Sequence, residues 1–338
     1  MAARDVVRRW TLLGSRIGLV TARPVPTRRQ IEEAARRLAP WVRTTPVVDV
    51  DPADLGMDRL HRPILLKLEL LQHAGSFKGR GAHNQLLADD LPAAGVVAAS
   101  GGNYGVAVAY TAHRLGVRAA VFVPNSTAPA KLARLHSLGA DVKVVPGYYD
   151  DALEASHDHA ASSGARFLHA YDQPEMLEGA GTLAAELERQ ARPGGGVDRV
   201  IVAVGGGGLI GGMACWHRGA TAITGVETHG CRTLDAALRA GAPVDVEVSG
   251  LAADALGARR VGALGFEAAR HWTDGVEVVG DTDVVDAQRR LWTALHVATE
   301  PAGAAALAAL TTGALAVDPD ERIAVVLCGA NVDPATLG

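Results

Sequence analysis

The chain has 338 residues, enough for about two domains of ordinary size. Lys and Arg number 33 against 37 Asp and Glu, and the formal charge of −4 argues against a nucleic-acid-binding protein, which usually carries a basic excess. Hydrophobic residues make up 48% and charged residues 21%, which excludes a mostly disordered chain. No apolar run reaches the roughly 18 residues of a transmembrane helix, so no membrane partner is expected.

Three cysteines, Cys215, Cys231 and Cys328, lie far apart and form no CxxC pair. A disulfide framework or a zinc site is therefore not expected, and a reducing, cytoplasmic compartment fits best. Residues 1–24 lack the uninterrupted apolar core of a secretory signal, so we expect a loose arm or a short helix there.

Strand and helix signals alternate from about residue 28 onward. The first helix is expected at 29–39, shortly after the plausible N-cap Thr27, with further helices at 82–87, 104–115 and 128–138. Strands are expected at 63–70, 96–99, 119–123, 141–145, 199–204, 223–227 and 322–327. This alternation predicts an α/β fold with parallel sheet covered by helices on both faces. Ligands of such sheets bind in the loops beyond the carboxyl ends of the strands.

The first candidate loop, residues 75–81 (GSFKGRG), contains Lys78, one of only four lysines in the chain. At the start of a helix the dipole disfavours a cation, and the same field lowers the pKa of an amine. A lowered pKa is what a Schiff-base lysine needs, so a catalytic lysine and a solvated turn cation are both open interpretations.

A second loop, residues 100–105 (SGGNYG), opens the helix expected at 104–115. Free amides at a helix start bind anions, which suits a carboxylate ligand, whereas a simple capped turn is the plainer interpretation. The thiol of Cys328, after the strand at 322–327, is by itself most simply explained as packing.

Four consecutive glycines at 205–208 follow the strand at 199–204. Such a run is entropically costly, so a nest of amides around a phosphate explains it better than packing does. A rival interpretation is a dinucleotide fingerprint, because Gly206, Gly208 and Gly211 satisfy GxGxxG and Glu227 lies 19 residues beyond Gly208.

Taken in this order and spacing, the four loops resemble the fold-type II family of pyridoxal-5′-phosphate enzymes, and in particular its serine/threonine dehydratases. The resemblance runs from about residue 30 to the end and includes the stretches LELLQ at 68–72 and EPAGAA at 300–305. It implies two open twisted parallel sheets with the cofactor in the cleft between domains. Residues 1–94 and 167–338 would form a large cofactor-binding domain, residues 95–166 a small mobile domain, and no C-terminal regulatory domain would follow.

The resemblance also implies roles for particular residues. Lys78 would form the Schiff base with the cofactor and later carry the Cα proton, while a neutral Cys328 would face the pyridine nitrogen and make the ring a weak electron sink. The cofactor-binding residues would be Phe77, Lys78, Asn103, Gly205, Gly206, Gly207, Gly208, Leu209 and Cys328. The substrate, through its carboxylate above all, would bind at Ser100, Gly101, Gly102, Asn103 and Tyr104.

Several departures from the family pattern qualify this assignment. Gly101 stands where serine racemases of the family carry a serine that serves as a second base, so racemisation should be poor. Tyr104 replaces a common His, which leaves the side-chain pocket open. Thr233 stands where relatives carry an acidic residue that, with the carboxylate at Glu227, binds a divalent metal. A monovalent cation at Glu227 and a structural carboxylate there are both open interpretations.

The sequence therefore predicts a carbon–oxygen lyase that eliminates water from a β-hydroxy amino acid of the L-serine or L-threonine type, giving a 2-oxo acid and ammonia. The same chemistry would act on 3-hydroxyaspartate or an aryl-serine, and β-replacement or racemisation are alternatives within the family. Two alternative interpretations fall outside that chemistry: an NAD(P)-binding oxidoreductase and a non-catalytic pyridoxal-phosphate-binding protein. Relatives are commonly dimers, so a homodimer is expected.

Overall fold

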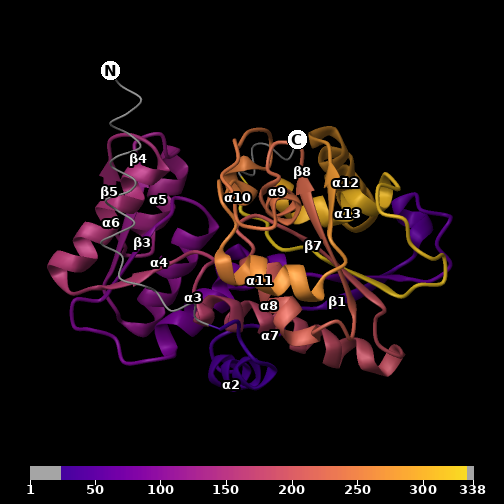
Figure 1. Ribbon diagram of the computed structural model, residues 1–338, viewed down its shortest axis with the longest axis horizontal. Helices are drawn as coiled ribbons and strands as arrows, with labels where there is room; N and C mark the ends of the chain where they lie inside the picture. The colour runs from indigo at the N-terminus through magenta and orange to yellow at the C-terminus, as the bar shows by residue number, and fades with distance from the viewer. Residues whose placement is uncertain (1–23, 333–338) are drawn as a thin grey trace.

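The computed structural model describes residues 24–332, and its strands form two separate sheets (Figure 1). The arm expected at residues 1–24 lies almost entirely outside the described residues. The larger sheet has six strands in the order β1 (Val47–Val50), β2 (Ile64–Lys67), β10 (Ile323–Val326), β7 (Arg199–Ala203), β8 (Ala222–Thr228) and β9 (Val276–Val279). All neighbouring strands in it are parallel except the edge pair β1–β2.

The smaller sheet is entirely parallel and lies at the left of Figure 1. Its strands follow the order β5 (Asp141–Val145), β4 (Ala119–Pro124), β3 (Val96–Ala99) and β6 (Arg166–Leu168). In β3, Val96 and Ala98 point into one apolar cluster and Val97 and Ala99 into another, as the alternation of side chains along a strand requires. The chain thus leaves the larger sheet after β2, builds the smaller one, and returns at β7.

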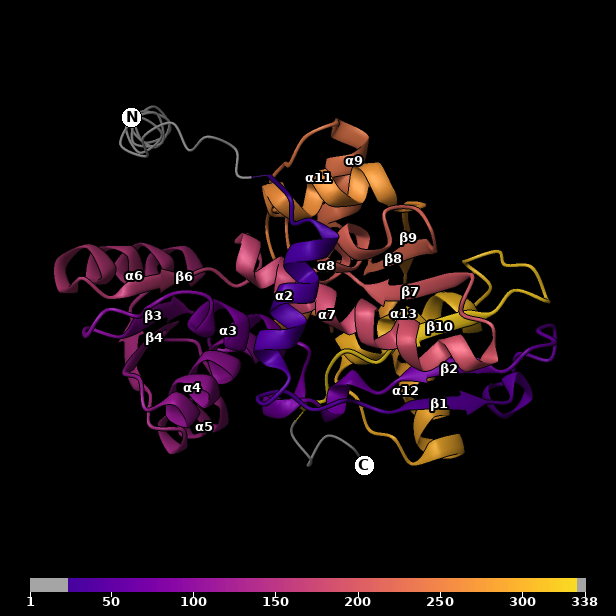
Figure 2. The same cartoon turned by 90° about the horizontal axis from the view of Figure 1, so that it is seen from below.

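Helices cover both faces of each sheet, as the alternating pattern predicts. Their bounds are α2 (Arg28–Leu38), α3 (Lys78–Leu87), α4 (Asn103–Leu115), α5 (Pro129–Ser137), α6 (Tyr149–Ser163), α7 (Pro174–Ala191), α8 (Gly208–His217), α9 (Thr233–Ala240), α10 (Ala253–Leu256), α11 (Ala263–Trp272), α12 (Asp281–Leu295) and α13 (Pro301–Thr311). Short 3₁₀ turns lie at Pro52–Leu55, Glu69–Leu71, His73–Gly75 and Arg192–Gly194. Around the larger sheet, α7 and α8 lie on one side and α12 and α13 on the other (Figures 1 and 2).

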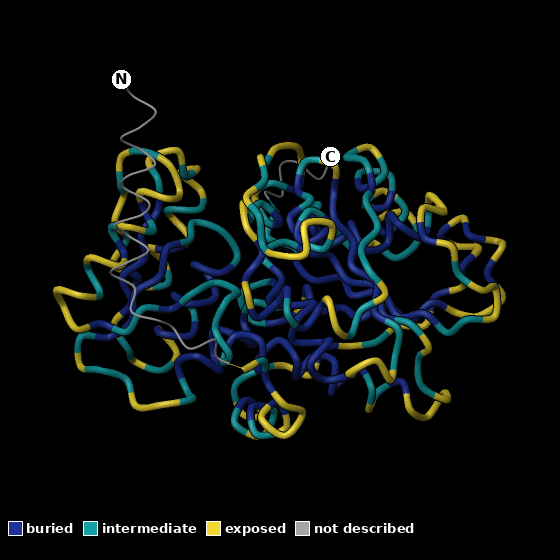
Figure 3. The backbone as a smooth tube through the Cα atoms, in the orientation of Figure 1, coloured by how far each residue is buried: buried dark blue, intermediate teal, exposed yellow. Residues whose placement is uncertain are grey.

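The core lies where parallel strands are buried on both faces. Every residue of β2, β3 and β10 is buried, so these strands show no alternating pattern; their residues are apolar except Lys67 at the end of β2. Figure 3 shows buried tube gathered in the interior of the molecule, with exposure concentrated in the peripheral loops and the outer helices. The edge strand β5 has no buried residue. In residues 24–332, no helix is both long and apolar enough to cross a membrane.

Most of the predicted elements are confirmed within a residue or two at each end. Thr27 caps α2, where its side chain accepts the Gln30 N–H and the Gln30 side chain reaches back to the cap. The helix expected at 82–87 instead begins at Lys78, so the lysine lies in the first turn itself. The strand expected at 63–70 is shorter, because residues 69–71 turn into a 3₁₀ segment.

Candidate active site

Three of the predicted loops meet because their strands are neighbours in the larger sheet. Strands β2, β10 and β7 lie side by side and parallel, so their carboxyl ends open at one edge. The lysine loop and the cysteine loop are joined directly: Phe77 N–H donates to Cys328 O at 3.0 Å, and Ala330 N–H donates to Gly75 O at 3.0 Å.

These loops surround a small cavity. Its walls bring together every residue predicted to bind the cofactor. The lining residues are Phe77, Lys78, Asn103, Ala203, Val204, Gly205, Gly206, Gly207, Gly208, Leu209, Ile210, Ala255, Leu256, Glu300, Ala302 and Cys328. Because Asn103 begins a helix on the smaller sheet and the glycines follow a strand of the larger one, the cavity lies between the two sheets.

Lys78 presents the amine of a half-buried side chain to this cavity. Its Nζ donates to the carbonyl oxygen of Ala170 at 2.7 Å and lies 4.9 Å from the centre of the Phe77 ring and 5.7 Å from that of Tyr104. Burial lowers the pKa of the Lys78 amine to about 8. The pKa of Lys78 is therefore lowered, as expected for an amine at the start of a helix, and burial is the main cause.

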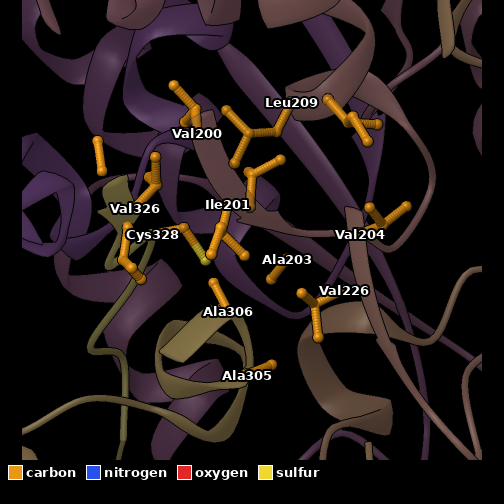
Figure 4. Packing of buried hydrophobic residues seen from close by; sticks show 14 of the residues in the cluster. Val200, Ile201, Ala203, Val204, Leu209, Val226, Ala305, Ala306, Val326 and Cys328 are labelled. Atoms are coloured by element: carbon orange, nitrogen blue, oxygen red, sulfur yellow. The ribbon is translucent and has the colours of Figure 1, made fainter. Parts of the chain in front are cut away.

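Cys328 presents a buried, neutral thiol to the same cavity. Its Sγ lies 3.4 Å from the carbonyl oxygen of Ala302, to which it donates. Burial raises the pKa of the thiol well above its usual value, and the nearby Glu300 carboxylate raises it further. Figure 4 shows Cys328 beside Val326, Ile201 and Ala306 in the apolar cluster under the cavity.

The glycine run forms a tight turn into α8. Gly207 has φ +86°, in the left-handed region, and caps the helix that begins at Gly208. The first amides of a helix have no partner within it, so those of Gly208 and Leu209 are available to an anion at the positive end of the dipole. A side chain at Gly206 would lie within 2.7 Å of Tyr171 Cδ2, so the turn is also closely packed from behind.

Asn103 is held by groups that are distant in the sequence. Its Nδ2 donates to Glu300 Oε1 at 2.6 Å, and Asn331 Nδ2 donates to its Oδ1 at 2.7 Å. Glu300 is buried at the start of α13, and burial raises the pKa of its carboxyl to about 7. No role was predicted for Glu300, although it stands in the EPAGAA stretch; only the fold shows that it meets Asn103.

The residues predicted to bind the substrate begin α4 at the edge of this cavity. Ser100 Oγ accepts the Gly102 N–H at 3.3 Å, and a side chain at Gly101 would lie within 2.9 Å of Thr127 Cγ2. Tyr104 is buried and its hydroxyl donates to Gln85 Oε1 at 2.8 Å, so the phenol oxygen is already bound within the protein. Of this loop, only Asn103 contributes to the cavity wall, and the substrate-binding roles stay predictions.

Glu227 has a structural task at the carboxyl end of β8. Its two carboxylate oxygens accept the N–H groups of Leu234 at 2.8 Å and Asp235 at 2.9 Å, in the first turn of α9. Burial raises the pKa of its carboxyl to about 7, although these amides oppose the change. The carboxylate lies outside the cavity wall, which removes the ribose contact that the dinucleotide interpretation required. Within residues 24–332, no cluster of three or more His, Cys, Asp or Glu side chains could hold a metal ion.

The arrangement fits pyridoxal phosphate. The cavity offers an amine for its aldehyde, a backbone turn with free helix amides for its phosphate, and a neutral thiol among the groups around its ring. A dinucleotide would use the glycine turn but would give Lys78 no task.

Comparison with known proteins agrees with this fit. The sequence model of the family described as "Pyridoxal-phosphate dependent enzyme" matches residues 38–329. The chain is 37% identical over 308 residues to the phenylserine dehydratase of Ralstonia pickettii, covering 89% of this chain and 91% of that one. It is 33% identical over 301 residues to the biosynthetic L-threonine dehydratase of Escherichia coli K12, covering 87% of this chain but only 58% of that relative's length.

A solved structure of maize serine racemase superposes with a TM-score of 0.85 at 30% identity. The superposition covers 93% of this chain and 96% of the racemase. The predicted architecture of two open, mostly parallel sheets with helices on both faces is thereby confirmed. The predicted division at residues 94/95 and 166/167 stays a prediction; strands β3 to β6 of the smaller sheet span residues 96–168.

Proposed function

Because the chain belongs to the family of pyridoxal-phosphate dependent enzymes, we propose that it eliminates water from a β-hydroxy amino acid, giving a 2-oxo acid and ammonia. The observation that carries this proposal is Lys78, whose amine has a lowered pKa and lines the same cavity as the glycine turn and a neutral thiol. Relatives named phenylserine dehydratase and L-threonine dehydratase support the reaction class.

Lys78 is proposed to anchor the cofactor and to move the Cα proton. Bound there, pyridoxal phosphate supplies a carbonyl that condenses with amines and a conjugated ring that takes up electron density from the substrate. With a pKa of about 8, roughly one Lys78 amine in ten is neutral at pH 7, far more than for an exposed lysine. The neutral amine can accept the Cα proton of a substrate held beside it.

Two other groups are proposed to orient the reactants. The first amides of α4, next to Ser100 and Gly102, face a site for the substrate carboxylate and stabilise it with the helix dipole. The neutral thiol of Cys328 donates at most a weak hydrogen bond, which favours elimination over reactions that need a long-lived carbanion.

The substrate side chain is proposed to be that of serine or threonine, or an aryl group. The relative from R. pickettii, similar over 91% of its length, supports an aryl-serine. 3-Hydroxyaspartate is the less supported alternative, since no Arg or Lys other than Lys78 lines the cavity in residues 24–332.

Two alternatives within the family fit the structure less well. Racemisation needs a second base, and Gly101 offers none; a side chain there would lie within 2.9 Å of Thr127 Cγ2. Cysteine-forming synthases usually carry Asp where Gly79 stands, and a side chain at Gly79 would lie within 2.7 Å of His73 O. The monovalent cation at Glu227, the homodimer and the cytoplasmic location stay predictions.

The proposal is tested by incubating the purified holoenzyme with L-serine, L-threonine, phenylserine and 3-hydroxyaspartate and measuring 2-oxo acid and ammonia. We expect both products in equal amounts from at least one of the first three. Lys78→Ala should abolish turnover, whereas Lys143→Ala, which removes a half-exposed lysine paired with Asp141, should retain it. Full turnover by Lys78→Ala would overturn the proposal.

A further inference from the structure

The amine of Lys78 has a defined resting place in the protein. Its Nζ donates to the carbonyl oxygen of Ala170 at 2.7 Å, across 92 residues of sequence. The rings of Phe77 and Tyr104 have their centres 4.9 and 5.7 Å from the amine, and the Tyr104 hydroxyl donates to Gln85 instead. The direction of a long, flexible side chain is therefore set by one backbone carbonyl.

That carbonyl belongs to a loop closed by a histidine. The loop joins β6 to α7, and His169 Nδ1 accepts the N–H groups of Tyr171 at 3.3 Å and of Asp172 at 3.0 Å. An imidazole nitrogen that accepts two N–H groups carries no proton, so the ring is neutral and protonated on Nε2. Burial, which lowers the pKa of His169 to about 4, keeps it in that state at neutral pH. The charged or titratable groups that face it are Asp172, Lys78, His157 and the Tyr171 ring, whose centre lies 4.6 Å away.

A second set of hydrogen bonds ties the same loop to the helix that carries Lys78. Gln85 Nε2 donates to His169 O at 2.9 Å and to Gln173 Oε1 at 2.6 Å. Gln173 Oε1 also accepts the His169 N–H at 3.0 Å. Gln85 lies seven residues after Lys78 on α3, about two turns along the same face. One helix therefore carries both the amine and the side chain that binds the loop of its acceptor.

We propose that the Ala170 carbonyl is the docking point for the Lys78 amine whenever that amine is free during the reaction, and that His169 is the positioning residue that holds the carbonyl in place. The proposal rests on the assigned role of Lys78 in the proposed function. It gives the loop 169–173 a task in the reaction.

Docking has two consequences for the reaction. The hydrogen bond holds the amine in one direction, which removes rotational freedom that would otherwise be lost in each turnover. It also stabilises the state in which an amino acid has displaced Lys78 from the cofactor. Loss of the dock should therefore weaken the binding of any amino acid, including one that has no β-hydroxyl to eliminate.

The test compares the holoenzymes of His169→Ala and His169→Asn with wild type. Asparagine places an oxygen near the position of Nδ1 and accepts N–H groups two and three residues ahead in the same way, so it should preserve the loop. His157→Ala is the matched control, because His157 stacks on Phe167 at 4.0 Å beside the same loop without an N–H of the loop on its ring. Binding of L-alanine, which cannot eliminate water, is followed by the change in the visible absorption of the bound cofactor.

For His169→Ala we expect L-alanine affinity to fall on the order of ten-fold or more, the size expected from losing a hydrogen bond to a charged or partly charged group. Cofactor content should stay at the wild-type level, and His169→Asn and His157→Ala should bind like wild type. An unchanged affinity in His169→Ala, or an equal loss in His169→Asn, would overturn the proposal.

Gln85→Glu gives a second route in case His169→Ala does not fold. It removes the donor to His169 O and keeps an acceptor for the Tyr104 hydroxyl, so it should weaken L-alanine binding in the same direction. Failure of the proposed function would look different: the absorption band of the cofactor would then persist in Lys78→Ala, whatever the behaviour of the His169 variants.

Discussion

Four charged side chains are buried together behind the lysine loop. Arg80, two residues after Lys78, donates to both oxygens of Glu69 at 2.7 and 3.0 Å and to Glu186 at 3.1 Å. Lys67 Nζ donates to the other oxygen of Glu186 at 2.5 Å, and none of the four side chains is more than 6% exposed. The charges balance, and although burial alone would raise the pKa of Glu186, Arg80 and Lys67 hold it below its usual value.

Replacing Arg80 by Met would break this balance. Glu69 would keep only the hydroxyl of Thr45, at 2.7 Å, and the cluster would carry one uncompensated negative charge. Removing one partner of a buried ion pair costs about 3–5 kcal/mol of unfolding free energy. The double variant Arg80→Met/Glu69→Met leaves the balanced Lys67–Glu186 pair, so it should recover much of that loss.

Urea unfolding of the holoenzymes, with the same excess of cofactor throughout, measures these differences from the transition midpoints. Arg29→Met is the matched control: Arg29 pairs with Glu33 on the surface with an 86% exposed side chain, and its loss should cost no more than about 1 kcal/mol. If Arg80→Met loses no more unfolding free energy than Arg29→Met, the buried charges do not stabilise one another as stated. The same conclusion follows if the double variant loses the sum of its two single losses.

Two further predictions concern the cavity itself. Gly206→Ala should weaken cofactor binding on the order of ten-fold, because the added carbon lies within 2.7 Å of Tyr171 Cδ2 and the turn must shift; equilibrium dialysis giving wild-type affinity would contradict this. The second is that kcat should rise with pH through about 8 and level off above it, since Lys78 acts as a base only when unprotonated and burial lowers its pKa to about that value. A kcat that is flat between pH 6 and 9 would contradict the role of Lys78 as that base.

The strands that carry the site could be predicted because they are buried on both faces and end in glycine-rich or polar loops. Strands β3 and β5 have the predicted bounds. The alternation of elements predicts parallel sheet covered by helices, whereas the division into two sheets is implied only by the family resemblance. Strand β1 was not predicted, since it is a four-residue edge strand with one buried residue and an antiparallel partner, and so carries little apolar signal. Strands β6 and β9 are similarly short and only partly buried.

The site could be predicted only as far as its residues belong to local patterns. Lys78 and the glycine turn stand in loops whose sequence alone suggests chemistry. Glu300 and Asn103 lie 197 residues apart, and their hydrogen bond exists only because the start of α13 reaches the start of α4. Glu227 shows the converse: the spacing from Gly208 suggests a ribose contact, while the fold places its carboxylate on the amides of α9.

The Nδ1 of His169 accepts two N–H groups, so the polar side chain has hydrogen-bond partners within the protein. The sequence could not indicate what these hydrogen bonds hold in place. The loop that His169 closes carries Ala170, whose carbonyl oxygen accepts the Lys78 amine. The two residues are 92 positions apart in the sequence. Only the packing of α3 against the β6–α7 loop relates the two.

The most direct test of the account is to reduce the holoenzyme with borohydride and locate the pyridoxyl group by peptide mass spectrometry. The chain has only four lysines, and the other three are paired with carboxylates: Lys67 in the buried cluster, Lys131 with Asp254 and Lys143 with Asp141. We predict the pyridoxyl group on Lys78 alone. Its attachment to another lysine, or to none, would contradict the assignment of Lys78 on which the proposed function depends.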